Sequence, residues 1–202
     1  MVKLRKDFYL RDDVVQIARD LIGKYLFTSI NGQKCGGIIV ETEAYNGRTD
    51  KACHAYLNRN TNRTKVMFQQ GGVSYIYLCY GIHYLFNIVT NTEGLADAVL
   101  VRAVQPVEGI AEMELRRGMS VSNKALTSGP GSMSKALGIT MEHYAADLCD
   151  NSIWIEDRPN EPFEIEARKR VGIDYAEEDK ELPWRFVMKD NKWVSRPKFG
   201  IL

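Results

Sequence analysis

Residues 37–45 have the sequence Gly-Ile-Ile-Val-Glu-Thr-Glu-Ala-Tyr, and this stretch decides how the chain is organised. Its first half is rich in β-branched residues, which are typical of a strand buried in a sheet. Its second half brings in Glu41 and Glu43, although an unpaired carboxylate is costly inside a core. Because residues two apart on a strand share one face, both glutamate side chains point the same way. The stretch therefore predicts a buried strand that ends in a functional site.

A second unusual stretch, residues 75–84, has the sequence Tyr-Ile-Tyr-Leu-Cys-Tyr-Gly-Ile-His-Tyr. Gly81 tolerates a positive φ angle, so we expect a hairpin turn there, with Tyr80 at its tip. An apolar or aromatic side chain on a protruding loop is one way in which proteins open a base step of duplex DNA. A carboxylate inside an aromatic pocket is what an enzyme needs to act on a flipped-out nucleotide. The two stretches together indicate an enzyme that acts on DNA.

The rest of the sequence predicts one α+β domain spanning residues 1–202, a length typical of a single domain. Asp12 and Asp13 can cap a first helix that ends at Gly23, and further helices are expected to begin near Pro106 and in the segment 128–131. The other expected strands lie at 25–30, 73–79, 84–89, 98–103, 152–155 and 163–167. The polar segment 46–64 lacks periodicity, which indicates a loop or short helices. Neighbouring strands with flanking helices favour a mainly antiparallel sheet.

The formal net charge of the chain is only +1, which does not by itself indicate a nucleic-acid-binding protein. The charge is unevenly distributed along the sequence. Residues 46–66 hold five basic residues and one acidic residue, whereas residues 150–182 hold eleven acidic and five basic residues. We therefore expect a basic face and an acidic back, although solvated loops would give the same pattern.

The cysteines and the N-terminus indicate a cytoplasmic protein, associated with the nucleoid if it is bacterial. The four cysteines form no Cys-x-x-Cys pair, which argues against structural zinc and suits a reducing compartment. The first residues lack the apolar run of a signal peptide. No segment approaches the roughly 20 apolar residues that span a bilayer, so no membrane partner is expected.

At these residues the chain resembles the monofunctional alkyladenine (3-methyladenine) DNA glycosylases, a family found in animals and bacteria. The matching stretches are residues 40–45, 54, 75–87, 99–103, 128–130 and 170–173, in the family's order. The resemblance implies one compact mixed domain with a protruding hairpin that intercalates into DNA. It implies base excision repair on double-stranded DNA that contains damaged purines, without a metal or organic cofactor. A monomer is the simplest arrangement for such a protein.

The resemblance assigns the catalytic role to Glu43 and a supporting role to Arg102. Hydrolysis of an N-glycosidic bond passes through an oxocarbenium-like sugar, so a carboxylate can stabilise positive charge and deprotonate a water. Glu41 is the competing candidate, and only the match of the Thr-Glu-Ala-Tyr block favours Glu43. Arg102 ends an apolar strand and needs an anionic partner, such as Glu43 or the DNA backbone. A purely structural ion pair is the alternative for both.

The resemblance also implies a pocket for the flipped base, formed by Tyr45, His54, Tyr77 and Asn87. A purine is held by stacking on aromatic faces, and electron-poor alkylated bases stack well on electron-rich rings. Tyr45 and Tyr77 match the stacking tyrosines, and His54 matches a histidine that stacks opposite them and hydrogen-bonds the purine edge. Asn87 matches an asparagine that crowds the 2-amino group of guanine. Its alternative role is to satisfy neighbouring backbone groups.

The DNA contacts implied by the resemblance come from the hairpin and from the basic loop. Tyr80 would fill the base stack after the nucleotide rotates out, and Ile82 would wedge beside it where the family often has methionine. Arg63 and Lys65 match basic residues that contact phosphates. The segment 128–132 resembles an anion-binding helix start, but the lysine that the family often has near Ser132 is absent.

The expected reaction releases 3-methyladenine, 7-methylguanine, hypoxanthine or 1,N6-ethenoadenine and leaves an abasic site. No lysine stands in the matched site, so no Schiff base and no strand cleavage are expected. Two alternatives remain open from the sequence. One is a protein that binds lesions without chemistry, and the other is a hydrolase of free nucleosides that uses Glu41 and Glu43 as a carboxylate pair. The sequence does not rank the purine substrates.

Overall fold

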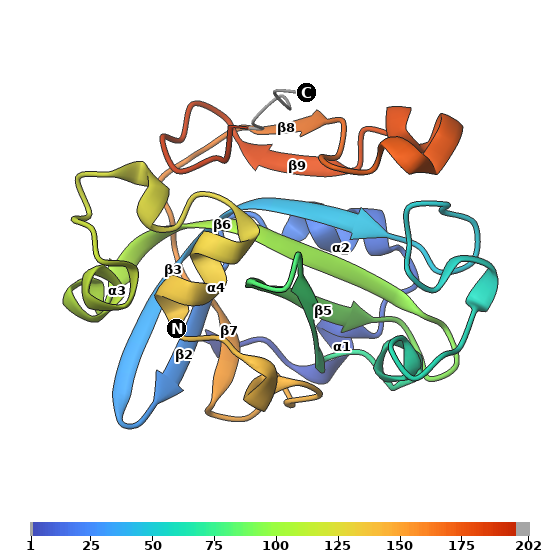
Figure 1. Cartoon of the computed structure of the whole chain (residues 1–202), viewed down its shortest axis with the longest axis horizontal. Coiled ribbons are helices and arrows are strands. Elements are labelled where there is room, and N and C mark those ends of the chain that lie inside the picture. The colour runs from blue at the N-terminus through green and yellow to red at the C-terminus, as the bar shows by residue number, and fades with distance from the viewer. Residues whose placement is uncertain (1, 197–202) are drawn as a thin grey trace.

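The computed structural model describes residues 2–196 of the chain as a mixed α+β domain built on a nine-stranded antiparallel sheet (Figure 1). The strands are β1 (Val2–Lys3), β2 (Tyr25–Ile30), β3 (Gln33–Tyr45), β4 (Ser74–Cys79), β5 (His83–Thr90), β6 (Asp97–Glu108), β7 (Ile153–Asp157), β8 (Ile165–Arg168) and β9 (Arg185–Met188). The α-helices are α1 (Lys6–Tyr9), α2 (Val14–Asp20), α3 (Ile110–Arg117) and α4 (Pro130–Leu137). Five 3₁₀ segments complete the described elements: η1 (Tyr56–Asn58), η2 (Lys65–Phe68), η3 (Lys124–Leu126), η4 (Met141–His143) and η5 (Asp174–Glu181). The prediction of an α+β domain with a mainly antiparallel sheet is therefore confirmed.

Strand β3 is the centre of the sheet, and the sheet branches along it. The strand order is β1-β7-β2-β3-β6-β5-β4, and β9 also pairs with β3. Strand β6 follows one edge of β3, whereas the other edge pairs first with β2 (residues 33–38) and then with β9 (residues 41–43). The second half of β3, which carries both glutamates, is thus enclosed by strands from distant parts of the chain.

Two β-bulges interrupt the pairing of β3 with β6 next to the glutamates. Ile39 pairs with Val104 and Glu41 with Ala103, which leaves Val40 as an extra residue on β3. Thr42 then pairs with Val101, which leaves Arg102 as an extra residue on β6. A bulge bends its strand and changes the direction in which a side chain points. These two bulges allow Arg102 to reach both glutamates.

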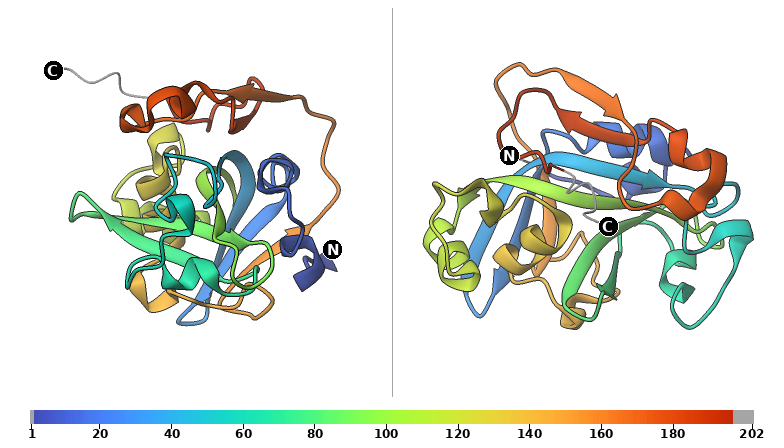
Figure 2. Two further views of the ribbon diagram at one scale, coloured as in Figure 1. Left: turned by 90° about the vertical axis from the view of Figure 1, so that its right-hand side faces the viewer. Right: turned by 45° about the horizontal axis from the view of Figure 1, so that its top comes forward.

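Helices cover both faces of the sheet (Figure 2). On one face α2 begins at Asp13, whose side chain accepts a hydrogen bond from the backbone N–H of Gln16 at 2.9 Å, as the capping prediction required. Thr42 Oγ1 donates to the carbonyl of Ala18 at 2.8 Å and ties α2 to β3. On the other face α4 packs on β5 and β6, with α3 beside it (Figure 1).

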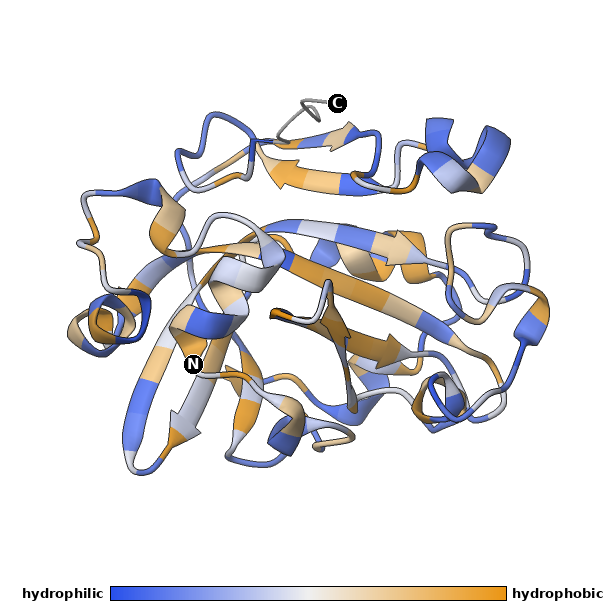
Figure 3. Cartoon of the chain, in the orientation of Figure 1, coloured by the Kyte–Doolittle hydropathy of each residue, from blue (hydrophilic) through white to orange (hydrophobic). Residues whose placement is uncertain are grey.

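The apolar core lies between these helices and the central strands. Figure 3 shows β5 and β6 as mostly hydrophobic, and residues 97–104 of β6 are buried throughout. A strand buried on both faces is expected to be a near-continuous apolar run. The exceptions are Asp97 at the start of the run and Arg102 within it, which are charged residues that are buried all the same.

The predicted start of a helix near Pro106 is wrong. Strand β6 continues through Pro106 to Glu108, and α3 begins four residues later than predicted, at Ile110. Gly37 permits this continuation, since a Cβ atom there would lie 2.5 Å from the carbonyl oxygen of Gln105. The helix predicted to end at Gly23 is α2, and it ends earlier, at Asp20. The short helix α1, which precedes it, was not predicted. The predicted loop with short helices at 46–64 is confirmed.

The expected separation of a basic face from an acidic back is wrong in part. Lys51, in the basic loop, forms ion pairs of 2.7 Å with both Glu177 and Glu178 of the acidic segment. The two oppositely charged segments therefore adjoin and neutralise each other locally. Within residues 2–196 the structure contains no helix that combines the length and the apolar character needed to cross a membrane.

Candidate active site

A cavity of about 410 Å³ opens beside the β4–β5 hairpin. Its walls come from the ends of β3 and β6, the loop after β3, both hairpin strands, the start of α4 and the segment 171–175. Most of the predicted site residues line it: Tyr45, His54, Arg63, Tyr77, Tyr80, Asn87 and Arg102. Glu43 lies just behind this lining, whereas Lys65 and Ile82 are exposed outside it. The fold thus brings together residues that lie far apart in the sequence.

Glu43 is fully buried behind the cavity wall, and three donors hold its carboxylate. Its Oε2 accepts hydrogen bonds from Tyr45 Oη at 2.8 Å and from Arg102 Nη1 at 3.2 Å. Its Oε1 accepts one hydrogen bond, from the backbone N–H of Val171 at 2.8 Å. Because an ionised carboxylate has about four acceptor positions, Oε1 retains one that no protein donor uses.

Glu41 is also buried, and four hydrogen bonds from two arginines and Ser195 hold its carboxylate. Its Oε1 accepts from Arg102 Nε and Arg185 Nε, both at 2.7 Å, and from Ser195 Oγ at 2.8 Å. Its Oε2 accepts from the backbone N–H of Ser195 at 2.7 Å. Burial opposes ionisation, yet the two guanidiniums and Ser195 hold the pKa of Glu41 below its ordinary value. Glu41 therefore anchors the surrounding strands and does not line the cavity.

Arg102 bridges the two glutamates and turns a repulsive pair into an ion-paired cluster. Its Nε bonds to Glu41 and its Nη1 to Glu43, while Nη2 donates to Ser195 Oγ at 3.4 Å. Burial lowers the pKa of Arg102, but the Glu43 and Glu41 carboxylates outweigh this effect and raise it above its ordinary value. The expectation that Arg102 has an anionic partner is confirmed, and the partner is both glutamates.

Tyr45 links Glu43 to the cavity. Burial and the adjacent Glu43 carboxylate raise the pKa of Tyr45 well above its ordinary value, so the phenol remains a hydrogen-bond donor. The Arg170 guanidinium lies 4.9 Å from the Tyr45 ring centroid, within the range of a cation–π contact. This contact and the bond to Glu43 fix the ring against one wall of the cavity.

The rings of His54, Tyr75 and Tyr77 form an aromatic cluster in the cavity lining. The His54 and Tyr77 centroids lie 4.7 Å apart at an interplanar angle of 75°, which is an edge-to-face contact. A base between two rings needs roughly 7 Å, twice the 3.4 Å stacking distance. The expectation that His54 stacks opposite Tyr77 is therefore wrong, because the two rings touch on the same side. Tyr45, on β3, also lines the cavity and takes no part in these ring contacts.

His54 is neutral in this arrangement. Its Nδ1 is 2.9 Å from Tyr75 Oη, and its Nε2 is 3.1 Å from Arg63 Nη2. Because a guanidinium can only donate, Nε2 accepts the bond from Arg63, and Nδ1 carries the proton toward Tyr75. Burial and the positive charge of Arg63 lower the pKa of His54 to about 4.

Asn87 is buried at the back of the cavity, and its amide nitrogen is bonded to the backbone. Nδ2 donates to the carbonyls of Tyr75 at 3.1 Å and Leu85 at 3.3 Å. These bonds correspond to the alternative role expected for this residue, which is to satisfy backbone groups. They also fix the orientation of the amide in the cavity.

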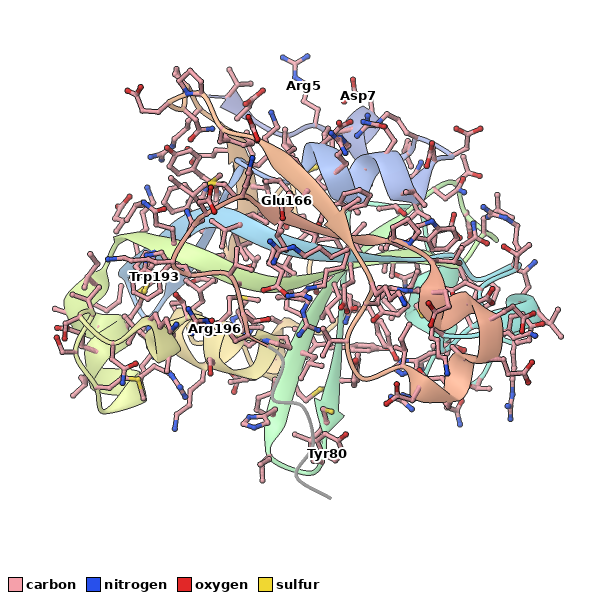
Figure 4. All side chains as sticks on the ribbon, turned by 90° about the horizontal axis from the view of Figure 1, so that it is seen from above. Arg5, Asp7, Tyr80, Glu166, Trp193 and Arg196 are labelled. Atoms are coloured by element: carbon pink, nitrogen blue, oxygen red, sulfur yellow. The ribbon has the colours of Figure 1, made fainter. Side chains whose placement is uncertain are left out.

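Tyr80 stands at the end of the hairpin and points away from the body of the protein (Figure 4). Its side chain is 92% exposed, and that of Ile82 is 72% exposed. Tyr80 and Gly81 have φ angles of 51° and 70°, and the N–H of Ile82 bonds to the carbonyl of Cys79 at 3.2 Å. This geometry is that of a type I′ turn, so the predicted turn position is confirmed. Two large apolar side chains are thus presented to solvent beside the cavity.

The turn end of the hairpin is braced by α4. A Cβ atom on Gly131 would lie 2.7 Å from the His83 ring, so glycine is what allows the helix to approach this closely. Pro130 occupies the first helical position and lines the cavity. Ser132 does not face an open anion site, because its Oγ lies 3.1 Å from Arg117 Nη2, which donates to it.

The segment that closes the cavity from the C-terminal side was not assigned a role from the sequence. Arg170 forms a buried bidentate pair with Asp50, with distances of 2.5 and 2.8 Å, and also bonds to the carbonyl of Ala44. This pair holds Val171 against Glu43. The match of residues 170–173 to the family was the available signal, but the contact itself joins residues 120 positions apart.

The described part of the chain contains no group of three or more His, Cys, Asp or Glu side chains placed to hold a metal ion. The four cysteines are all free thiols. The cavity chemistry available from this chain is therefore a buried carboxylate, two guanidiniums, a neutral imidazole and several phenols.

Comparison with known proteins gives a consistent result. The family model described as "Methylpurine-DNA glycosylase (MPG)" matches residues 7–192. A protein of Desulfitobacterium hafniense (strain Y51) named "Putative 3-methyladenine DNA glycosylase" is 44% identical over 202 residues, covering 96% of this chain and 99% of that protein. A protein of Chlamydia abortus with the same name is 46% identical over 186 residues, covering 92% of this chain and 97% of that protein. A protein of Alkaliphilus oremlandii with the same name is 45% identical over 202 residues. The match covers 96% of this chain and 100% of that protein.

Proposed function

The chain belongs to the methylpurine-DNA glycosylase family, and we propose that it is a 3-methyladenine DNA glycosylase of base excision repair. The observation that best supports this activity is the pairing of a buried carboxylate with an aromatic cavity beside an exposed hairpin tyrosine. Glu43 lies behind the cavity lining, and Tyr80 stands exposed at the rim of the cavity. The first suits hydrolysis of a bond to a flipped base, and the second suits opening of the base stack.

We infer that Tyr80 enters the base stack as the damaged nucleotide rotates out, with Ile82 beside it. Unstacking a base costs a few kcal/mol, and an aromatic ring that fills the gap recovers part of this cost. The exposure of both side chains supports this role, since neither is needed for the core. Lys65 is exposed at the start of η2 and is proposed to contact a phosphate, which would position the duplex without reading its sequence.

The flipped purine is proposed to stack between Tyr45 on one side and the Tyr77–His54 wall on the other. The wall is rigid, because His54 bonds to Tyr75 and contacts Tyr77 edge to face. Asn87 lies at the back, where its fixed amide would crowd the 2-amino group of guanine. This arrangement favours adenine-type purines.

Glu43 is proposed to activate the water that attacks C1′ of the sugar. Its Oε1 has one acceptor position left, and a water there would donate a proton to the carboxylate as it attacks. The negative charge of Glu43 would also stabilise the oxocarbenium-like sugar. Arg102 and Tyr45 both hold Oε2, so they orient the carboxylate with Oε1 free to act.

The leaving base determines whether an acid is needed. Cationic bases such as 3-methyladenine and 7-methylguanine depart as neutral molecules once the bond breaks. Neutral bases such as hypoxanthine and 1,N6-ethenoadenine leave more easily when protonated. Among the described residues that line the cavity none is a lysine, so we propose simple hydrolysis without a Schiff base.

Product analysis on duplex DNA tests this function. Duplexes with a single hypoxanthine or 1,N6-ethenoadenine, and methylated DNA, are incubated with the protein and EDTA. The expected products are a free purine and an intact strand with an alkali-labile abasic site. Borohydride should trap no covalent complex. Strand cleavage without alkali, or a trapped complex, would contradict the hydrolytic mechanism.

The same assay separates the two alternatives. A protein that only binds lesions would retain the duplex and release no base. A nucleoside hydrolase would cleave free inosine, and Tyr80→Ala would leave that activity unchanged. We expect instead that free inosine is not cleaved at a useful rate and that Tyr80→Ala reduces base release from duplex DNA.

A further inference from the structure

Arg63 does not extend from the surface as a free phosphate ligand but lies over the cavity wall. Its guanidinium carbon is 5.1 Å from the centroid of the Tyr77 ring. Its Nη2 donates to His54 Nε2 at 3.1 Å. The side chain therefore covers a ring and an acceptor that belong to the cavity lining.

This guanidinium carries a positive charge that no nearby carboxylate neutralises. Within residues 2–196 Arg63 takes part in no ion pair, in contrast to Arg102 and Arg170 at the same site. Its charge contributes to the lowered pKa of His54, after burial. An arginine that lines a cavity, is exposed to solvent and has no carboxylate partner is available to bind an anion.

A base that enters the cavity competes for the same two groups. The Tyr77 ring is one of the faces on which a purine would stack, and His54 Nε2 is the acceptor on the same wall. Arg63 and a purine cannot both occupy these positions. The nucleotide that brings the purine also brings a phosphate on each side, which is the anion that Arg63 lacks.

We propose that Arg63 is a placeholder that occupies the base site in the DNA-free protein and moves to a flanking phosphate when the base enters. This inference rests on the proposed function and deepens it. The phosphate removes the guanidinium from Tyr77, so binding of the DNA backbone opens the base site. Once Arg63 has left, His54 keeps its proton on Nδ1, bonded to Tyr75, and presents Nε2 as an acceptor to the base.

Two consequences follow from this exchange. Free purines bind weakly to the protein alone, because they must displace Arg63 without offering it a phosphate. DNA and free base then bind cooperatively, since each favours the state in which Arg63 has left the cavity. The cost of displacement is the same for every base, so removal of Arg63 strengthens the binding of hypoxanthine and of 7-methylguanine equally.

The test measures the affinity of free hypoxanthine and free 7-methylguanine by calorimetry, with and without a duplex that carries a stable abasic-site analogue. For Arg63→Ala we expect both bases to bind about tenfold more tightly than to the wild type when no DNA is present. The duplex should strengthen base binding to the wild type by a similar factor and have no such effect on Arg63→Ala. Arg59→Ala, a basic-to-neutral change in the same loop, should behave like the wild type.

Three results would overturn the proposal. Weaker base binding by Arg63→Ala would mean that Arg63 holds the base, and unchanged binding would mean that it does not compete. A gain confined to one of the two bases would mean that Arg63 discriminates between them and does not simply occupy the base site. Arg63→Gln serves as a second variant if the alanine variant folds poorly, and it should show the same loss of coupling to DNA.

The NMR titration of His54 gives a second readout. In the wild type the pKa of His54 is expected near 4, and it should rise in Arg63→Ala but remain below 6.5, because burial persists. Base release from lesion-containing duplex by the wild type is measured in parallel. Absence of release would refute the proposed glycosylase function, whereas release without the coupling to DNA would refute only the role of Arg63.

Discussion

At the scale of single residues, Glu41 and Glu43 share one strand face but have different partners. Glu41 is bonded to two guanidiniums and to both the backbone and side chain of Ser195. Glu43 is bonded to one guanidinium, one phenol and one backbone N–H, and it keeps an unused acceptor position. The difference in partners assigns a structural role to the first glutamate and supports the catalytic role that we propose for the second.

This assignment predicts that Glu41→Gln destabilises the protein much more than Glu43→Gln does. Loss of the Glu41 charge leaves Arg185 buried without an anionic partner, and breaking such a pair costs about 3–5 kcal/mol. After Glu43→Gln, Arg102 remains paired with Glu41. Urea unfolding at neutral pH measures the free energy of unfolding of each variant. Equal losses in the two variants would contradict the division of roles.

His54 predicts how stability depends on pH. Its pKa is near 4 in the folded protein, below the ordinary value of 6.5, so the unfolded chain binds the proton more tightly. The contribution of His54 to stability is therefore complete above about pH 6.5 and is lost as the pH falls toward 4. Its size is on the order of 3 kcal/mol at most.

The matching measurement is the free energy of unfolding of the wild type and of His54→Gln between pH 7 and pH 4. The decline over this window should be smaller in the variant, which has no imidazole to protonate. A decline of the same size in both proteins would mean that His54 is not held neutral in the native state.

Sequence reasoning identified these residues but not their contacts. The period of two along β3 places Glu41 and Glu43 on one face, and this could be predicted. The donors that distinguish them could not, because Val171 and Ser195 lie 128 and 154 positions away from the glutamates that they contact. The bulge that aims Arg102 at both carboxylates has no sequence signature of its own.

At the scale of secondary-structure elements, the hairpin carries backbone strain at the residue that we propose inserts into DNA. Tyr80 has a φ angle of 51°, a left-handed conformation that costs a non-glycine residue about 1–2 kcal/mol. A type I′ turn prefers asparagine before glycine. The aromatic side chain is thus retained at a position where another residue would be more stable.

Tyr80→Asn should therefore raise the free energy of unfolding by about 1 kcal/mol while reducing base release from duplex DNA. Thermal unfolding and a base-release assay on the same preparation measure the two effects. Ile82→Ala is the control for the stability measurement alone, since it truncates an exposed side chain without altering the strained position. Unchanged base release in Tyr80→Asn would contradict the proposed intercalation.

The contact between α4 and the hairpin gives a further prediction at this scale. Alanine in place of glycine stabilises most helices, but at Gly131 the added Cβ would lie 2.7 to 2.8 Å from three atoms of His83. Gly131→Ala should therefore destabilise the protein and displace the hairpin. The double variant with His83→Ala should recover most of the lost stability in a double-mutant cycle. If the losses of stability in the two single variants simply add, His83 is not the side chain that excludes a Cβ atom at position 131.

Elements were predictable where the pattern was local and uninterrupted. The β4–β5 hairpin and the cap of α2 follow from short signals, Gly81 and Asp13. The start of α3 was misplaced because pairing with β3 extends β6 past Pro106. Strand β9 was missed, since its four residues acquire their pattern only by pairing with β3 and β8.

At the scale of the whole molecule, the C-terminal part of the chain completes a site that the N-terminal part begins. The segment 165–188 returns to the far half of β3, and Figure 1 shows β8 and β9 lying along it. The Arg170–Asp50 pair and the Lys51 ion pairs hold this segment on the loop after β3. A net charge near zero thus arises from neighbouring opposite charges, while Arg63 at the cavity stays without a carboxylate partner among residues 2–196.

We propose that Glu43 performs the hydrolysis in a site whose other residues serve to bind the substrate. The most direct measurement is the single-turnover rate of base release from a hypoxanthine-containing duplex by excess wild-type or Glu43→Gln protein, with the dissociation constant of the same duplex determined in parallel. We predict that Glu43→Gln binds the duplex within a few fold of the wild type and releases the base at least about 100-fold more slowly. Release of the base by Glu43→Gln at the wild-type rate would contradict the proposed role of Glu43 in hydrolysis.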